Sequence, residues 1–332
     1  MSKYARERET AIKAIADAAI ICKKVQAEIS PDVLEKKDKS PVTVADFGSQ
    51  ALVCRELGNA FPDDPVIGEE DSRELRLPES AALLQRLLTI VQTVLPSASA
   101  DEVLGWIDRG GQDTYCERFW TLDPIDGTKG FLRREQYAIS LALIEKGEIV
   151  LGALCCPNLT AHDGSDGAIF VAVKGEGSVE LPLQAATKGK SAEKPISVSA
   201  ETDAARIRTC ESVEKAHSSH SDSARIATRL GITADPVRID SQAKYAAVAR
   251  GDAEAYLRLP RDGKYREKVW DHAGGVLVVE EAGGKVSDIR GHALDFTHGK
   301  TLAHNIGVIV TNGIFHDAII ATVDELKIGQ FN

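Results

Sequence analysis

The segment from Asp123 to Thr128 combines residue types that bind metal ions and phosphates. It follows the strand-like run Phe119–Leu122, so the carboxylates at positions 123 and 126 leave a buried strand at one edge of a sheet. Pro124 fixes the backbone, the carbonyl of Ile125 can face the same point, and Gly127 permits phosphate to approach free N–H groups. Oxygen ligands of this kind suit Mg²⁺, which commonly shares carboxylates with a substrate phosphate. An Asp-Gly turn with solvated acids is the simpler alternative.

Three further acidic positions each have an ordinary structural interpretation. Glu69 follows the short apolar run Val66–Ile67 and can reach the same sheet edge, or it belongs to a solvated acidic loop. Asp46 lies near a helix start after Thr43, where its ordinary role is to favour the helix dipole. Asp271 precedes an apolar helix, where an N-cap is the ordinary role. Each position is a weak signal alone, whereas their joint occurrence in this order is a strong one.

The charge balance limits the partners of the protein. The 40 Lys and Arg residues against 50 Asp and Glu residues give a net charge of −10. Nucleic-acid backbones and anionic membranes repel such a protein, so neither is an expected partner. An anionic substrate then requires a recruited cation, and a metal ion is the obvious candidate.

Several other kinds of site are excluded by their missing motifs. The chain has no Walker phosphate loop, no complete dinucleotide fingerprint and no nucleophile elbow. His217 and His220 lie three apart without neighbouring cysteine or carboxylate partners, so a zinc site is not expected there.

Apolar spacing predicts three helices in the first hundred residues. Apolar side chains recur at intervals of four and three over 11–29, and Ser30 with Pro31 ends this helix. Thr43 is expected to cap a second helix toward Phe61, and the leucines and valine over 84–95 indicate a third. The weakly patterned stretch 96–117 is expected to be a surface excursion.

The rest of the chain alternates between strand and helix patterns. Strands are predicted over 119–122, 137–144, 149–155, 168–173, 196–199, 237–239, 255–259 and 306–310. Helices are predicted over 221–230, 242–249, 272–281 and 314–326. The segments 137–144 and 149–155 should form a hairpin, and 185–195 should be an exposed loop. We expect an N-terminal α+β domain over 1–200 with most metal ligands, and a C-terminal α/β domain over 201–332.

Composition indicates an ordinary globular protein. The 332 residues are 43% hydrophobic and 27% charged, which suits a packed core and excludes wholesale disorder. None of the six cysteines forms a Cys-x-x-Cys pair, and Cys22 and Cys54 fall on apolar helical faces, so reduced thiols are expected. No apolar run is long enough for a membrane span, and Met1–Glu9 is unlike a secretory leader, so we expect a cytoplasmic protein.

Four segments together resemble the inositol monophosphatase-like, lithium-sensitive, metal-dependent phosphatases. They are Ser40–Asp46, Gly68–Asp71, Asp123–Thr128 and Trp270–Gly274. Within that superfamily, the segments Glu214–Ser219, Asp240–Tyr245 and Tyr256–Pro260 resemble the 3′(2′),5′-bisphosphate nucleotidases, especially the fungal and plant type. The resemblance spans nearly the whole chain and implies an α/β (α+β) fold, a layered αβαβα sandwich. The stretch 96–117 matches none of these motifs.

The resemblance implies a set of metal ligands. Glu69, Asp123 and the carbonyl of Ile125 would hold one Mg²⁺, while Asp123, Asp126 and Asp271 would hold a second. A third, looser ion near Glu69 gives two to three ions per site. Inhibition by lithium is implied as well.

It also implies catalytic and substrate-binding residues. Asp46 and Thr128 would orient and deprotonate the attacking water. The implied substrate-binding residues are Gly127, Thr128, His217, Ser241, Lys244 and Arg258.

The predicted function is therefore a hydrolase. We expect a monomer that removes the 3′-phosphate of adenosine 3′,5′-bisphosphate, a small nucleotide of sulfur metabolism, to give AMP, and that also acts on 3′-phosphoadenylyl sulfate. One alternative is an inositol phosphate phosphatase with the same metal site. An alternative of another class is an inactive metal-binding sensor or scaffold, against which the pair Asp46 and Thr128 argues.

Overall fold

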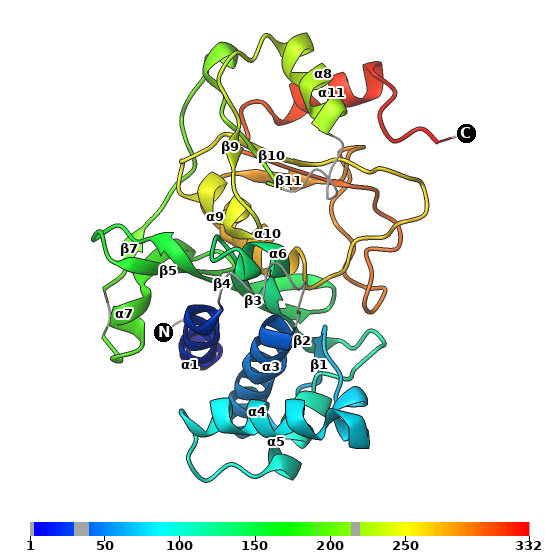
Figure 1. Cartoon of the computed structure of the whole chain (residues 1–332). Helices are drawn as coiled ribbons and strands as arrows, with labels where there is room; N and C mark the ends of the chain where they lie inside the picture. The colour runs from blue at the N-terminus through cyan, green and yellow to red at the C-terminus, as the bar shows by residue number, and fades with distance from the viewer. Residues whose placement is uncertain (1–2, 30–39, 191, 214–219, 332) are drawn as a thin grey trace.

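Helices and sheets alternate in five layers (Figure 1). The computed structural model describes residues 3–29, 40–190, 192–213 and 220–331. From one side to the other, the layers are two long helices, a seven-stranded sheet, a pair of short helices, a five-stranded sheet and a last pair of helices. This arrangement confirms the predicted αβαβα sandwich.

The seven-stranded sheet runs in sequence order from β1 to β7. Its strands are β1 (Val66–Gly68), β2 (Arg118–Asp126), β3 (Ala138–Glu145), β4 (Glu148–Thr160), β5 (Asp166–Val173), β6 (Gly177–Pro182) and β7 (Lys194–Pro195). Only the β1–β2 pair is parallel, and the other neighbours are antiparallel. The predicted hairpin is confirmed as β3 and β4. The strand predicted at 196–199 is wrong, because β7 ends at Pro195.

Two long helices cover one face of this sheet. They are α1 (Ala5–Glu28) and α3 (Ser40–Ala60), and they pack against each other and against β4 and β2 respectively. Alanines and isoleucines at the predicted spacing, such as Ala11, Ile15 and Ala18, are fully buried on α1. Thr43 lies inside α3, so its prediction as a cap is wrong.

The stretch 96–117 contains a helix that the sequence analysis missed. Beside α4 (Ala81–Gln92), the helix α5 (Ala100–Asp108) packs on α3 and buries Val103 and Ile107. Its start is a capping box, in which the side chains of Ser99 and Glu102 each accept a hydrogen bond from the other residue's backbone N–H. The stretch therefore extends the core below the first sheet rather than forming only a surface excursion.

The five-stranded sheet has the order β11-β12-β10-β8-β9. Its strands are β8 (Thr209–Glu211), β9 (Val237–Arg238), β10 (Ala255–Arg258), β11 (Lys285–Ser287) and β12 (Val308–Thr311). The helices α8 (His220–Leu230) and α11 (His316–Glu325) pack together on its outer side, and the short helices α6 (Thr128–Leu132) and α7 (Leu183–Ala186) lie near the first sheet. Three 3₁₀ turns complete the described elements, η1 (Glu74–Arg76), η2 (Pro78–Ser80) and η3 (Ala204–Arg206).

The middle layer joins the two sheets. It consists of α9 (Ala243–Ala249) and α10 (Ala273–Glu281), and α10 contacts β3, β4 and β5 on one side and β11 on the other. Both helices are apolar around most of their circumference because both sides are covered. Glycine at 152 is required by the close packing, since a Cβ there would lie 2.5 Å from the carbonyl oxygen of Gly274. The division into two domains at residue 200 remains a prediction.

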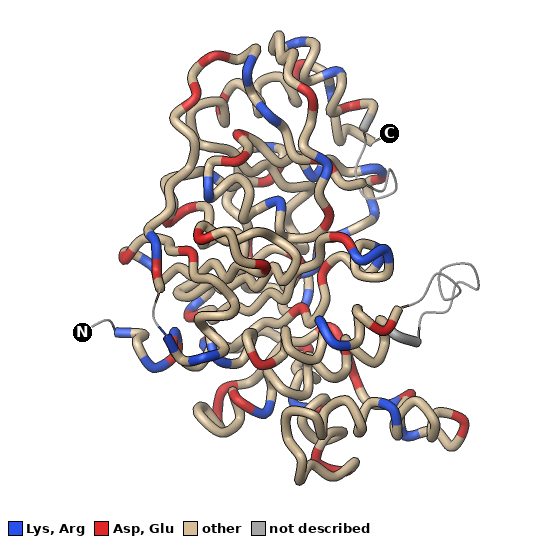
Figure 2. The backbone as a smooth tube through the Cα atoms, turned by 60° about the vertical axis from the view of Figure 1, so that its left-hand side comes forward, with Lys and Arg blue, Asp and Glu red and all other residues tan. Residues whose placement is uncertain are grey.

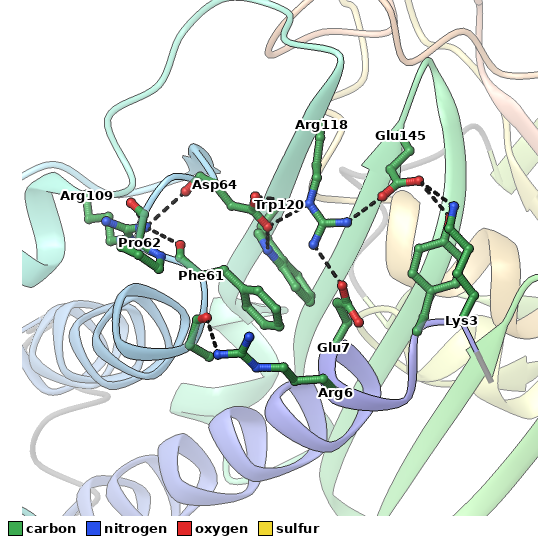
Figure 3. A network of polar contacts seen from close by, with 12 residues as sticks. Lys3, Arg6, Glu7, Phe61, Pro62, Asp64, Arg109, Arg118, Trp120 and Glu145 are labelled. Carbon is green, nitrogen blue, oxygen red and sulfur yellow. Dashed lines mark hydrogen bonds and ion pairs between the residues drawn. The ribbon is translucent and has the colours of Figure 1, made fainter. Parts of the chain in front are cut away.

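A polar network fixes the start of β2 to the N-terminal helix (Figure 3). The Arg118 guanidinium binds the carboxylates of Asp64 at 2.9 Å and Glu7 at 3.0 Å, and that of Glu145 as well. The indole N–H of Trp120 donates to Asp64 at 3.0 Å. Because Arg118 and Asp126 are the first and last residues of β2, the network stabilises the end of the strand remote from the acidic segment.

The distribution of charged residues and the state of the cysteines match what the composition predicts. Figure 2 shows acidic and basic residues interspersed over both halves of the described chain. All six cysteines are unpaired, and Cys22 and Cys54 are buried as expected. Among the described helices, none combines the length and apolarity needed to cross a bilayer.

Candidate active site

Two neighbouring parallel strands bring the first acids together. Gly68, the last residue of β1, is in register with Leu122 of β2, so Glu69 follows the end of β1 beside Asp123, which lies in the last part of β2. Asp123 is buried, whereas Glu69 lies at the rim of the site, partly exposed to solvent and partly enclosed beside the other acids. The parallel pairing therefore explains why two segments far apart in sequence share one site.

Helix α3 positions both acidic turns. The side-chain amide of Gln50 donates to the carbonyl of Glu70 at 2.6 Å, and its oxygen accepts from the Glu70 N–H at 3.1 Å. The hydroxyl of the preceding residue, Ser49, donates to the carbonyl of Pro124 at 2.9 Å. Asp46, on the same helix, is 6% exposed and lines the site. A single helix thus fixes the turn after β1, the end of β2 and one candidate catalytic carboxylate.

A tight approach between two turns forms the opposite wall. Gly127 has φ +89°, and a Cβ there would lie 2.8 Å from the Cβ of Ser241, so glycine is required. Ser241 itself has φ +68°, a rare conformation for a residue with a side chain. Its hydroxyl accepts a hydrogen bond from the Ala243 N–H at 3.1 Å, which fixes the turn before α9.

Gln242 connects this wall to the rest of the molecule. Its backbone N–H donates to a carboxylate oxygen of Asp126, and its side-chain amide donates to the Trp270 carbonyl at 2.9 Å. Its side-chain oxygen lies 3.1 Å from the Ser140 hydroxyl and 3.2 Å from the Gly275 nitrogen, and accepts from both. Gln242 therefore fixes Asp126 relative to the turn that carries Asp271.

These elements enclose a cavity of about 260 Å³. It is lined by the predicted residues Asp46, Glu69, Asp123, Ile125, Asp126, Gly127, Thr128, Ser241, Lys244, Arg258 and Asp271. His217 lies outside the described residues. Asp271 is not the N-cap of α10, a position occupied by His272. The structure thus brings together every predicted site residue that it describes.

The acids in the cavity repel one another. Burial, reinforced by neighbouring carboxylates, raises the pKa of Glu69, Glu70 and Asp271 to about 7. Burial also raises the pKa of Asp123 and Asp46 well above the usual range, and nearby acids add to the effect. Such a cluster is unfavourable when charged, unless cations compensate it.

Two of these carboxylates have an unsatisfied oxygen. Oδ1 of Asp46 and Oδ1 of Asp123 are buried without a hydrogen-bond partner among the described residues. Buried polar atoms are rarely left without a partner, because each costs about 1–3 kcal/mol. Oxygen atoms in this state, within a set of carboxylates and one backbone carbonyl, fit hard divalent cations such as Mg²⁺.

Two cationic side chains lie in the same cavity. Lys244 is 3% exposed, its ammonium lies 5.1 Å from the centre of the Tyr256 ring, and burial lowers its pKa. The Arg258 guanidinium binds Glu267, with Nη2 2.9 Å from a carboxylate oxygen, and lies 3.9 Å from Asp271. The cavity therefore offers positive charge beside the acids.

Glu267 holds Arg258 in place. Nε2 of His272 lies 3.1 Å from the Glu267 carboxylate, and Nδ1 of the same ring lies 2.7 Å from the Tyr245 hydroxyl. Burial alone would raise the pKa of Glu267, but the hydrogen bond to His272 and the charge of Arg258 lower this pKa to about 2. Glu267 is thus a charged anchor for the arginine.

Sequence reasoning missed several residues of the site. Glu70 and Tyr265 line the cavity, and Gln242 and Glu267 fix its walls. The Glu70 carboxylate was visible in the acidic run after β1. No local sequence signal marks Gln242 or Glu267, because their partners are distant in the chain.

Comparisons with known proteins agree with this geometry. The model of the inositol monophosphatase family matches residues 4–327, and that family is metal-dependent. A protein of Emericella nidulans named 3′(2′),5′-bisphosphate nucleotidase is 42% identical to this chain, and the match covers 97% of this chain and 99% of the relative. A protein of the same name in Schizosaccharomyces pombe is 44% identical, and the match covers 95% of this chain and 94% of the relative. A solved inositol monophosphatase from Zymomonas mobilis shares the fold, with a TM-score of 0.63, 19% identity and coverage of 98% of this chain and 100% of that one.

Proposed function

Because the chain belongs to the inositol monophosphatase family, we propose that it is a Mg²⁺-dependent 3′(2′),5′-bisphosphate nucleotidase. It would convert adenosine 3′,5′-bisphosphate to AMP and inorganic phosphate. Relatives with this name are 42% and 44% identical over nearly their whole lengths, which supports a shared substrate class. The proposal includes 3′-phosphoadenylyl sulfate, which carries the same 3′-phosphate.

The position of Lys244 is the observation that carries the proposal. Its ammonium is buried in the cavity that the acids line, and its contacts there are a long hydrogen bond of 3.4 Å to the Ile239 carbonyl and the face of the Tyr256 ring. Neither contact neutralises a buried positive charge, so the site favours an anionic group at this point. A substrate with one phosphate leaves this ammonium unused, whereas the second phosphate of a bisphosphate nucleotide pairs with it.

We assign the acids to metal binding as the family resemblance implies. Glu69, Asp123 and the Ile125 carbonyl would hold one Mg²⁺, and Asp123, Asp126 and Asp271 a second, with a looser third ion near Glu69. The unsatisfied oxygen of Asp123 and the raised pKa values of these acids support the assignment. When bound, Mg²⁺ supplies Lewis acidity and positive charge for transfer of the phosphoryl group to water.

Asp46 and Thr128 are the proposed water-binding pair. Asp46 comes from α3 and Thr128 is the first residue of α6, so the two reach the cavity from different elements. The raised pKa of Asp46, caused by burial and by the nearby Glu70, makes its carboxylate a stronger proton acceptor. Thr128 would orient the water, and Asp46 would accept the proton as the oxygen attacks the 3′-phosphorus.

The remaining polar groups would bind the nucleotide. Gly127 and Thr128 lie beside the acids, where the 3′-phosphate would bind, and Ser241 and Lys244 lie where the second phosphate would bind. Arg258, oriented by Glu267, presents its remaining N–H groups to the same substrate. The role of His217, the monomeric state and the cytoplasmic location remain predictions.

Phosphate release from three substrates tests the proposal. The purified protein is assayed with adenosine 3′,5′-bisphosphate, 3′-phosphoadenylyl sulfate and inositol monophosphate, each in excess Mg²⁺ and in excess chelator. We expect kcat/KM for the nucleotides to exceed that for inositol monophosphate at least tenfold, and release to stop without Mg²⁺. Preference for inositol monophosphate would overturn the assignment of the substrate. Absence of any metal-dependent phosphate release would indicate a sensor or scaffold.

A further inference from the structure

Three side chains of types that commonly bind metals lie outside the catalytic cavity, in the segment between β11 and β12. The carboxylate of Asp295 and the imidazoles of His298 and His304 offer ligand atoms that all lie within 4.8 Å of one another. Nε2 of His298 is 3.0 Å from Oδ2 of Asp295, and Nδ1 of His304 is 3.8 Å from the same oxygen. We propose that these residues form a second metal site, which binds a transition-metal cation such as Zn²⁺.

The spacing and the atom types select this class of ion. Zinc bonds of about 2.0–2.1 Å to nitrogen and oxygen, at tetrahedral angles, separate neighbouring ligand atoms by about 3.3 Å. The two distances to Asp295 lie on either side of this value, so small side-chain rotations would bring the three ligand atoms to the spacing that a tetrahedral zinc ion requires. Two imidazole nitrogens with one carboxylate favour Zn²⁺ over Mg²⁺, which prefers oxygen ligands in an octahedron. Three protein ligands leave a coordination position for water.

A set of hydrogen bonds already orients the carboxylate. Oδ1 of Asp295 accepts from the backbone N–H and the hydroxyl of Thr297, at 3.0 and 2.6 Å. The backbone N–H of Asp295 donates at 2.8 Å to the side chain of Asn305, a buried residue that also binds Asp288. Oδ2 is therefore the oxygen directed at the histidines. Partners of this kind fix metal ligands and commonly strengthen binding.

The two imidazoles are close together and accessible. Their ring centres are 4.1 Å apart, and the side chain of His304 is 69% exposed. A hydrated cation can thus reach them from solvent. Two protonated rings at this distance repel each other, whereas two neutral rings beside one carboxylate can bind a divalent cation together.

The proposed site is connected to the segment that leads to Asp271. The Val269 N–H donates to the Lys300 carbonyl at 3.1 Å, and the Leu302 N–H donates to the Glu267 carbonyl at 2.9 Å. An ion bound by residues 295–304 would hold this segment against residues 267–269. None of its three ligands lines the catalytic cavity, so binding does not depend on the magnesium site.

Visible absorption of Co²⁺, a substitute for Zn²⁺, tests the site directly. The full chain without an affinity tag is titrated with Co²⁺ in excess Mg²⁺, which occupies the carboxylate site. We expect intense visible bands of four-coordinate Co²⁺ that saturate at one equivalent and disappear when Zn²⁺ is added. The bands should persist in Asp123→Asn, which removes a ligand of the proposed magnesium site only.

Matched histidine variants locate the ion. His298→Gln and His304→Gln should each weaken Co²⁺ binding at least tenfold, about 1.4 kcal/mol. His292→Gln is the control, because His292 is an exposed imidazole of the same segment that faces Asp288 instead. Amide hydrogen exchange in residues 267–269 and 295–304 should slow with Zn²⁺ in the parent and not in His304→Gln. Absence of the bands, or equal affinity in the parent and both glutamine variants, would overturn the proposal.

Discussion

A carboxylate oxygen of Asp126 accepts a hydrogen bond from the backbone N–H of Gln242, which lies 116 residues further along the chain. Asp126 ends a strand of the first sheet, and Gln242 precedes a helix of the middle layer. The bond therefore joins the proposed metal ligands of the N-terminal half to the turn at Ser241 and to the start of α9, which carries Lys244. In the proposed site, it would fix the distance between the groups that bind the two phosphates of the substrate.

Asp123→Asn should nearly abolish hydrolysis while the fold survives. The amide keeps the shape of the carboxylate but removes the charge that two cations share. Without metal, the melting temperature should stay equal or rise, because repulsion from Glu69, Asp126 and Asp271 is relieved. Phosphate release and thermal melting in chelator measure the two effects. Turnover like that of the wild type would exclude Asp123 as the bridging ligand.

The stability of the metal-free protein should fall as pH rises from about 4.5 to above 7. Glu69, Glu70 and Asp271 have pKa values of about 7 in the fold, raised by burial, whereas they ionise near pH 4 when the chain unfolds. In this window the folded state binds more protons than the unfolded state, so raising the pH favours unfolding.

Mg²⁺ should reverse this trend, because it binds the ionised acids. The gain in melting temperature from Mg²⁺ is therefore expected to grow from pH 5 to pH 8. Thermal melts in chelator and in Mg²⁺ across this range measure it, and Asp123→Asn should show a smaller gain. A gain that is constant with pH, or that shrinks, would argue against metal binding by these acids.

Arg118→Met should destabilise the protein by about 2 kcal/mol with little change in kcat. The substitution leaves Glu7, Asp64 and Glu145 beside one another without their shared cation. Lys285→Met is the matched control, because its pair with Asp317 is exposed and should contribute less than about 1 kcal/mol. Denaturant unfolding measures both. A large loss of kcat in folded Arg118→Met would show that this network influences the site.

Most of the site and much of the fold could be predicted from the sequence, because their signals lie within short stretches of the chain. The acidic segments, such as the one from Asp123 to Thr128, come directly after apolar runs that are visible in the sequence. Helix α5 was missed because it has only nine residues, although Ser99 and Glu102 give a capping signal. Gln242 and Glu267 could not be predicted, because each acts through contacts with residues that only the tertiary structure brings near.

The most direct test of the proposed nucleotidase is the effect of Lys244→Met on two substrates. We expect KM for adenosine 3′,5′-bisphosphate to rise at least tenfold, about 1.4 kcal/mol, while hydrolysis of a small monophosphate stays nearly unchanged. Lys188→Met, at an exposed lysine, should change neither. Unchanged KM for the nucleotide in Lys244→Met, or an equal loss on both substrates, would contradict a site in which Lys244 binds the second phosphate.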